Sequence, residues 1–215
     1  MMFPVFAAAL LLAAEAHVRR QAPSPAEVPQ QQNLTDDQIR DQIETYLGAI
    51  DTPIGIARWR SLGPRAAPFL EAIAESPREL PMRRAKAIEG LSAVGGDKAK
   101  GLLTQLARTE DESLVVRLSS VRGMGRLERG SQLSAALRPV LEGAKDARVR
   151  GLAATALSEQ APTSACAAVK AQAQREDDES RIHYRKALER CGEPPAPAPA
   201  QAPAPDQQPA PDKAQ

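Results

Sequence analysis

Apolar residues recur along the middle of the chain at spacings of three and four, the period of a helix with one buried face. The segment Asp146–Leu157 shows the pattern most fully, with an acidic start signal and Arg150 beside the first core position. An arginine takes the same place 33 residues earlier at Arg117, 33 earlier again at Arg84, and 31 later at Arg181. A frame that returns at this interval indicates a stack of helical repeats.

Each of these arginines is followed, seven residues on, by a large apolar residue that has a small residue just before it. The large residues are Leu91, Met124, Leu157 and Leu188, and the small ones are Gly90, Gly123, Ala156 and Ala187. Trp59 takes the large position in an earlier copy, so we interpret it as a core residue. Small residues at a fixed place predict close approach of neighbouring helices.

The breaks between apolar segments divide the chain into two alternating kinds of helix. We expect first helices at about 36–49, 65–75, 97–108, 131–143 and 163–175. We expect second helices at about 53–62, 79–94, 113–128, 147–160 and 179–191. The predicted fold is all-α, an α-solenoid of about five antiparallel helix pairs between residues 35 and 192. Pro139 lies inside one predicted helix, where a kink or an early start is expected.

The boundaries of this repeat domain follow from local signals. Thr35 and Gln38 form a capping box, and Leu34 with Ile39 makes a hydrophobic staple, so the domain begins there. Residues 17–34 hold prolines and a glutamine run, which predicts a flexible linker. Residues 193–215 hold eight prolines and predict a disordered, extended Pro/Ala-rich tail.

The first 16 residues resemble a secretory signal peptide. An apolar run from Phe3 to Ala14 is too short to span a bilayer, and Ala14-Glu15-Ala16 fits a cleavage site. We therefore expect export to the periplasm, cell envelope or medium, and no transmembrane segment. The lack of Lys or Arg before the run, with Arg19 and Arg20 soon after it, leaves a cytoplasmic location as the alternative.

The composition limits the classes of function. Aromatic residues make up only 3% of the chain, which suits thin alanine- and leucine-rich helical layers. The whole chain has a net charge of +1, far from the basic excess of a typical nucleic-acid binder. This balance by itself decides little about nucleic acid, which is not the expected partner because an exported protein rarely meets it.

The second-helix segments resemble HEAT repeats, specifically the short HEAT-like repeats of phycobilisome-lyase-type proteins. The segments that carry the likeness are RRAKAIEGL, VRLSSVRGMG and VRGLAATAL, with Asp146 ahead of Arg150. The likeness covers about residues 35–192 and implies the fold far more than a function. The first pair has Thr52 where the arginine belongs, and the last has Arg185 at a core position. Such departures are expected of terminal repeats, which face water on one side.

The arginine ladder, Arg84, Arg117, Arg150 and Arg181, is the main candidate constellation. One interpretation is a track for nucleic acid or another polyanion. The interpretation we prefer is structural, with each arginine bound to helix-end carbonyls and to an acidic residue of a neighbouring repeat. Asp111, Asp146 and Asp177 are the expected partners.

Cys166 and Cys191 are the two cysteines of the chain, and they match no zinc spacing. Each lies about three turns from the turn at 176–178, on helices that run in opposite directions, so the two should face each other. In an oxidising compartment we expect a disulfide, and in the cytoplasm two buried thiols.

Other chemistry is not indicated. His183 has no catalytic partner at a suitable spacing, and the acidic run 176–179 fits a helix start rather than a calcium loop. We expect no catalytic residue, no cofactor and no metal site.

The sequence thus predicts a non-catalytic protein–protein interaction scaffold, exported, with a protein partner that the sequence does not identify. Polyanion binding along the ladder is one alternative. A lyase or a lyase accessory, implied by the family resemblance alone, is the other. The oligomeric state is left open.

Overall fold

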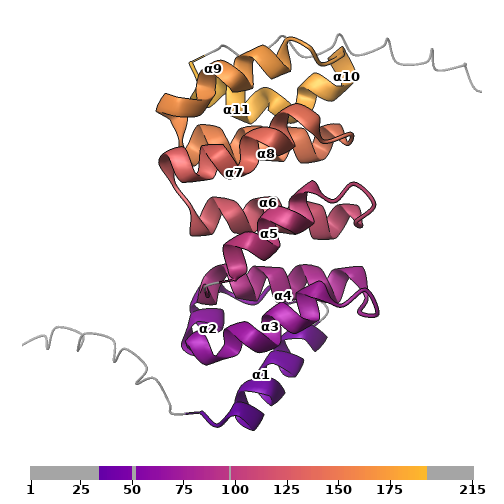
Figure 1. Ribbon diagram of the computed structural model, residues 1–215, viewed down its shortest axis with the longest axis vertical. Helices are drawn as coiled ribbons and strands as arrows, with labels where there is room; N and C mark the ends of the chain where they lie inside the picture. Colours follow the sequence, from indigo (N-terminus) through magenta and orange to yellow (C-terminus); the bar gives the residue numbers. More distant parts are fainter. Residues whose placement is uncertain (1–33, 50–51, 97, 193–215) are drawn as a thin grey trace, which may run out of the picture. The chain divides into compact units, whose positions relative to one another are not determined.

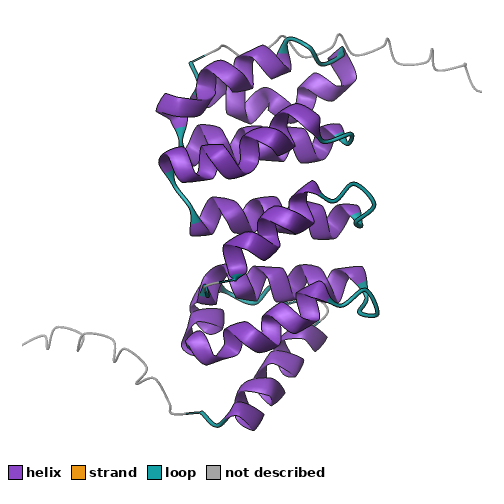
Figure 2. Cartoon of the chain, viewed as in Figure 1, coloured by secondary structure: helices purple, strands orange, loops and turns teal. Residues whose placement is uncertain are grey.

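The computed structural model describes residues 34–49, 52–96 and 98–192, and within these ranges the regular secondary structure is entirely helical (Figures 1 and 2). The expected all-α class is confirmed. The expected signal peptide (1–16) and tail (193–215), and all of the expected linker except Leu34, lie outside the described residues. No helix in the described ranges has the length and apolar content needed to cross a membrane.

Two rows of helices alternate along the chain. The first-helix row consists of α1 (Asp36–Gly48), the 3-10 turn η1 (Pro64–Ala66) with α3 (Ala67–Glu75), α5 (Ala99–Arg108), α7 (Gly130–Gly143) and α9 (Pro162–Ala173). The second-helix row consists of α2 (Ile56–Ser61), α4 (Pro81–Val94), α6 (Leu114–Leu127), α8 (Ala147–Gln160), and the broken last helix α10 (Asp178–Arg181), η2 (Ile182–Tyr184) and α11 (Arg185–Arg190).

Contacts run both along and between these rows. In the second-helix row, α4 packs against α6, α6 against α8, and α8 against η2 and α11. In the first-helix row, α3 packs against α5, α5 against α7, and α7 against α9. Consecutive helices also pack in pairs, such as α3 with α4 and α7 with α8 (Figure 1). Most helices therefore have packing partners on two sides, whereas the apolar spacing in the sequence predicted one buried face.

The core between the rows is built from small and medium aliphatic side chains. The large residues of the repeat frame, Leu91, Met124 and Leu157, are all buried, and Trp59 joins them as predicted. Leu188 is only partly buried, because it lies on the last helix. Buried alanines fill much of the remaining core, so the layers are thin.

Local signals account for several helix ends. The predicted capping box is present: Thr35 Oγ1 accepts from the Gln38 backbone N–H at 3.3 Å, and Gln38 Oε1 accepts from the Thr35 N–H at 2.8 Å. Asp146 caps α8 and Asp177 caps α10 through their side chains. These caps fix where the chain enters each helix.

Two second-row predictions need adjustment, those of α2 and of the last helix, whereas α6 lies within one residue of its expected bounds. Helix α2 begins at Ile56 rather than near residue 53, because Ile54 is buried in an extended segment before it. The last helix is not continuous over 179–191, since η2 interrupts it and buries Tyr184 at the break. Helix α6 ends at Leu127, and Gly130, at a φ of 55°, begins α7. Pro139 lies within α7, which starts well before it.

The small residue of the repeat frame is required by close helix contact. A Cβ atom added at Gly90 of α4 would lie 2.6 Å from Cε3 of Trp59, a distance that real Cβ atoms do not show. The indole of Trp59 is fully buried between α2 and α4 and cannot retreat without displacing its neighbours. By contrast, a Cβ at Gly101 in α5 would meet nothing within 4 Å.

We predict that Gly90→Ala lowers the free energy of unfolding by about 1–3 kcal/mol, as overpacking in a filled core does. The matched control Gly101→Ala should raise it by about 0.5–1 kcal/mol, because alanine is the better helix former. Urea unfolding followed by far-ultraviolet circular dichroism measures both. Equal effects of the two substitutions would contradict the close contact at Trp59.

Candidate functional site

Three ladder arginines lie at equivalent places near the starts of α4, α6 and α8, and their side chains are largely buried. Arg84 Nε donates to the carbonyl of Ala74 at 2.9 Å, and Arg117 Nε donates to that of Ala107 at 3.4 Å. Arg150 Nη1 donates to the carbonyls of Ala144 and Lys145, each at 2.7 Å. These carbonyls lie at or just beyond the end of the preceding helix, where no backbone donor of that helix remains for them. Each arginine therefore ties a second helix to the end of its first helix.

Each of the three also binds a glutamate through two nitrogen atoms. Arg84 donates to Glu112 at 2.9 and 2.6 Å, and Arg117 donates to Glu110 at 3.0 and 2.6 Å. Arg150 Nε donates to Glu176 Oε1 at 2.6 Å, and its Nη2 donates to Glu176 Oε2. Paired bonds of this kind are strong and directional.

The expected aspartate partners, Asp111, Asp146 and Asp177, are therefore wrong. The carboxylates that bind are glutamates directly beside Asp111 and Asp177 in the chain, and no glutamate is adjacent to Asp146. Asp146 and Asp177 use their short side chains to cap the helices that follow them, and Asp111 is exposed in its turn. A glutamate has one more methylene group and can reach from the turn to the buried guanidinium. The acidic run 176–179 is thus more than a helix start, because Glu176 is a ladder partner.

The glutamates also link one helix pair to the next. Glu112, from the turn before α6, binds Arg84 of α4, and Glu176, from the turn before α10, binds Arg150 of α8. Glu110 binds Arg117 of its own pair and accepts the backbone N–H of Lys145, in the turn before α8. The ladder therefore connects neighbouring pairs through their turns.

Glu176 has the densest set of partners. Its carboxylate also accepts from Gln172 Nε2 at 3.0 Å and from the hydroxyl of Tyr184 at 2.8 Å. Hydrogen bonding from Arg150 outweighs burial and holds the pKa of Glu176 at about 2, below its ordinary value. Burial, followed by the bond to this carboxylate, raises the pKa of the Tyr184 hydroxyl. Glu176 thus stays ionised and ties α8, α9 and η2 together.

Arg181, the last ladder residue, differs from the other three. It donates to the carbonyls of Ala173 and Glu176 at 3.2 Å, but its carboxylate partner, Asp178, is fully exposed at 3.4 Å. The described helices include no further pair beyond it. Arg181 therefore has the partners expected of an arginine in the last described helix pair, which has no following described turn to bind.

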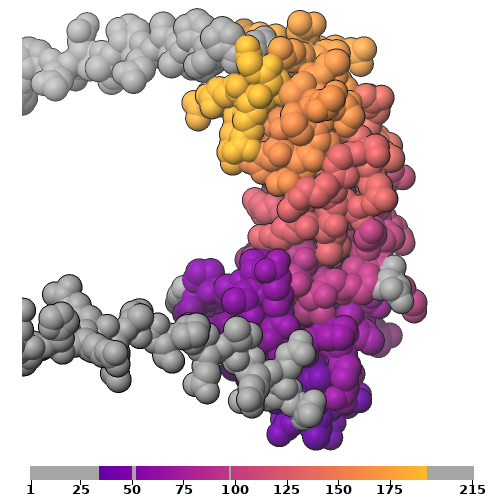
Figure 3. Space-filling view, turned by 90° about the vertical axis from the view of Figure 1, so that its left-hand side faces the viewer, coloured from indigo at the N-terminus to yellow at the C-terminus, as the bar shows by residue number. Residues whose placement is uncertain are grey.

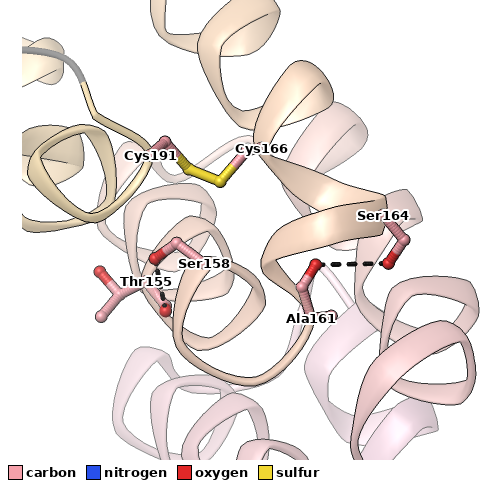
Figure 4. Close-up of a disulfide and its surroundings, with 6 residues drawn as sticks. All are labelled: Thr155, Ser158, Ala161, Ser164, Cys166 and Cys191. Carbon is pink, nitrogen blue, oxygen red and sulfur yellow. Dashed lines mark hydrogen bonds between the residues drawn. A yellow bond between two sulfur atoms is a disulfide. The ribbon is translucent and has the colours of Figure 1, made fainter.

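The two cysteines form a disulfide in the structure. Cys166 in α9 and Cys191, just after α11, have Cα atoms 5.5 Å apart, and the bond joins the two helices (Figure 4). Figure 4 also shows the end of α8 below the bond, where Ser158 Oγ donates to the carbonyl of Thr155 at 2.9 Å. The disulfide therefore fixes the final helix against the rest of the last pair.

The open side of the second-helix row carries a depression of about 230 Å³ between α6, α8 and η2, which we call the second-helix groove. It is lined by Leu118, Arg122, Arg148, Gly151, Leu152, Thr155 and His183. A smaller depression of about 70 Å³ adjoins it, and Arg122 lines both. In Figure 3 the central residues are recessed on the left-hand side, between the purple residues of the first helices and the yellow residues of α11.

Apart from the histidine His183, no groove residue stands out in the sequence. Arg122 and Thr155 each come five residues after a ladder arginine, at positions that look like ordinary exposed helix residues. His183 lies on the groove wall, against Gly151, where an added Cβ would collide with it. Among the described residues, no group of three or more His, Cys, Asp or Glu side chains is arranged to hold a metal ion.

No protein-family model, no curated protein and no solved structure matches this chain.

We predict that Arg150→Gln lowers the free energy of unfolding by about 1–3 kcal/mol. The substitution leaves the Glu176 carboxylate buried, but Gln172 and Tyr184 still bind it, so the loss should be smaller than the roughly 3–5 kcal/mol of a buried ion pair that loses one partner outright. Arg148→Gln is the matched control on the same helix, where the side chain is 56% exposed and the loss should be clearly smaller than at Arg150. Urea titration measures the free energy of unfolding of both variants. Equal values for the two would rule out a structural role for the ladder.

We predict that the unreduced protein, taken from the compartment in which it matures, contains no free thiol. Alkylation under denaturing conditions should add no label before reduction and two labels after it. The bond closes a loop of 25 residues and should contribute about 3 kcal/mol, so a Cys166→Ser, Cys191→Ser variant should melt at a lower temperature. Two labels without reductant would show that the disulfide is absent in the cell.

Proposed function

We propose that this protein is a HEAT-like α-solenoid that acts as a non-catalytic scaffold, binding a partner protein along its second-helix row. The solenoid part of the proposal is supported by the agreement between the 33-residue sequence frame and the packing order α4, α6, α8 and α11. Stacks of this kind use their extended helical surfaces for binding.

The shape and lining of the second-helix groove are the strongest support for binding of a partner protein. It combines a half-buried aliphatic floor with charged and polar side chains at its rim, the mixture found where proteins bind one another. It is also shallow and open, which suits a polypeptide better than a small substrate that must be enclosed.

The ladder gives little support to polyanion binding. Three of its four guanidinium groups are largely buried and already bound to glutamates and helix-end carbonyls. A phosphate would have to displace these partners. The lyase alternative continues to depend on the family resemblance alone.

We also propose that the protein is exported. The disulfide is consistent with an oxidising compartment, since such bonds are uncommon in the cytosol of mesophiles. The segment with signal-peptide character lies outside the described residues, so this part of the proposal rests on its sequence and on the two cysteines.

Site-specific photo-crosslinking in the cells that make the protein tests the scaffold. A photoreactive residue at Ser119 or Thr155, beside or in the second-helix groove, should give a discrete protein adduct several times more abundant than at the exposed Ala135 or Arg138 of α7. Excess unmodified protein should compete for the adduct. Equal labelling of both helix rows, or adducts with nucleic acid alone, would contradict the proposal.

A further inference from the structure

The second-helix groove contains a cationic side chain that its neighbours do not neutralise. Arg122 of α6 is exposed, lines both depressions, and has no hydrogen-bond or ion-pair partner among the described residues. The buried ladder arginines are all paired, so Arg122 differs from them in position and in partners. Its five N–H donors point to a ligand that accepts hydrogen bonds and carries negative charge.

The neighbouring arginines add to this positive character without being fully available. Arg148 binds Asp146 through Nε and Nη2, which leaves Nη1 for another acceptor. Arg126 lies 3.5 Å from Glu89 and donates to Ser92 Oγ at 3.1 Å. Arg122, unpaired among the described residues, thus has one partly paired guanidinium beside it in the groove, Arg148, and another in the smaller depression, Arg126.

An apolar floor lies one helical turn from Arg122. Leu118 precedes it by four residues on α6, and Leu152 of α8 also lines the groove. Side chains four apart on a helix have Cβ atoms about 5–6 Å apart. In an extended peptide, residues i and i+2 on the same side are about 6.6 Å apart. An apolar residue followed two positions later by an acidic one would match this spacing.

The acidic rim residues disfavour a long polyanion. Glu89 lines the smaller depression, and Asp146 is bound to Arg148 at the edge of the groove. Both carboxylates would repel a continuous phosphate backbone, whereas a single carboxylate can reach Arg122 between them. The aliphatic floor likewise offers no favourable contact to a polar, charged sugar–phosphate chain.

We propose that the second-helix groove binds an extended acidic segment of a partner protein, with an apolar side chain over Leu118 and Leu152 and a carboxylate, two residues further on, bound by Arg122 and Nη1 of Arg148. The proposal rests on the scaffold function and adds the chemical class of its partner.

Selection of a random twelve-residue peptide library, displayed on phage, against the full-length protein tests this specificity. Selected peptides should be enriched in an aliphatic residue followed two positions later by Asp or Glu, and selection against Arg122→Glu should lose this enrichment. A synthetic copy of a selected peptide should bind Arg122→Gln at least about tenfold more weakly, as loss of a charged hydrogen bond requires. Arg138→Gln on α7, an equal change of charge on the other row, should leave its affinity unchanged.

The outcomes separate the two proposals. Peptides that bind this groove without acidic enrichment would overturn the acidic-partner inference and leave the scaffold function standing. The absence of any selected peptide, together with equal crosslinking on both rows, would count against both. Binding of a 20-nucleotide single-stranded DNA at about 150 mM salt that Arg122→Gln abolishes would make the groove a polyanion site. Because Arg122 is exposed, its variants should keep the wild-type unfolding midpoint, which is checked beforehand.

Discussion

The fold of the described region depends on buried arginines that hold turns and helix ends together. Each of Arg84, Arg117 and Arg150 replaces missing backbone donors at the end of one helix and binds a glutamate from a nearby turn. A guanidinium can do both because it has five donors in one plane. Burying such a charge is costly unless every part of it is satisfied, and here carbonyl and carboxylate share it. The arrangement therefore connects each of these helices to a neighbouring turn and to the end of the helix before it.

This use of arginine depends on thin helical layers. The core between the rows consists largely of alanine and leucine, with few aromatic residues to fix the position of one helix against the next. Gly90 lets the Trp59 indole pack directly on α4, and Gly151 lets the backbone of His183 approach α8. The paired charges in the turns then connect one helix pair to the next. At the C-terminal end there is no further described pair to bind, and the disulfide between α9 and α11 with the Glu176 cluster takes over that role.

Two arginines of one helix have different roles. Arg117 and Arg122 both belong to α6, five residues apart, which places them on different faces of the helix. Arg117 faces the turns, is buried and is fully paired, so it contributes to the fold. Arg122 faces the groove and has no such partner among the described residues, so its donors remain available. Burial and pairing, rather than residue type, distinguish a structural arginine from a candidate binding residue.

Most of the helical architecture can be read from the sequence, because it follows from local rules. The period of the apolar residues sets the helices, the Thr35 capping box and Asp146 set two of their starts, and the repeated arginine marks equivalent positions in successive pairs. The facing of Cys166 and Cys191 also follows from counting turns along two helices. The sequence could not choose Glu110, Glu112 and Glu176 over the adjacent aspartates. That choice depends on side-chain reach across a turn and on which carboxylates the backbone already uses as caps.

The second-helix groove is formed by tertiary packing alone. Leu118, Arg122, Leu152 and His183 come from three elements, and nothing in their local pattern distinguishes them from other exposed or half-buried helix residues. The interruption of the last helix at η2 likewise arises from packing, because Tyr184 must reach Glu176 and His183 must fit against Gly151. Helix formation is governed by neighbours in the chain, which the sequence displays directly. A binding surface is made by residues that meet only after the helices have stacked, and the distances between them exist only in the folded molecule.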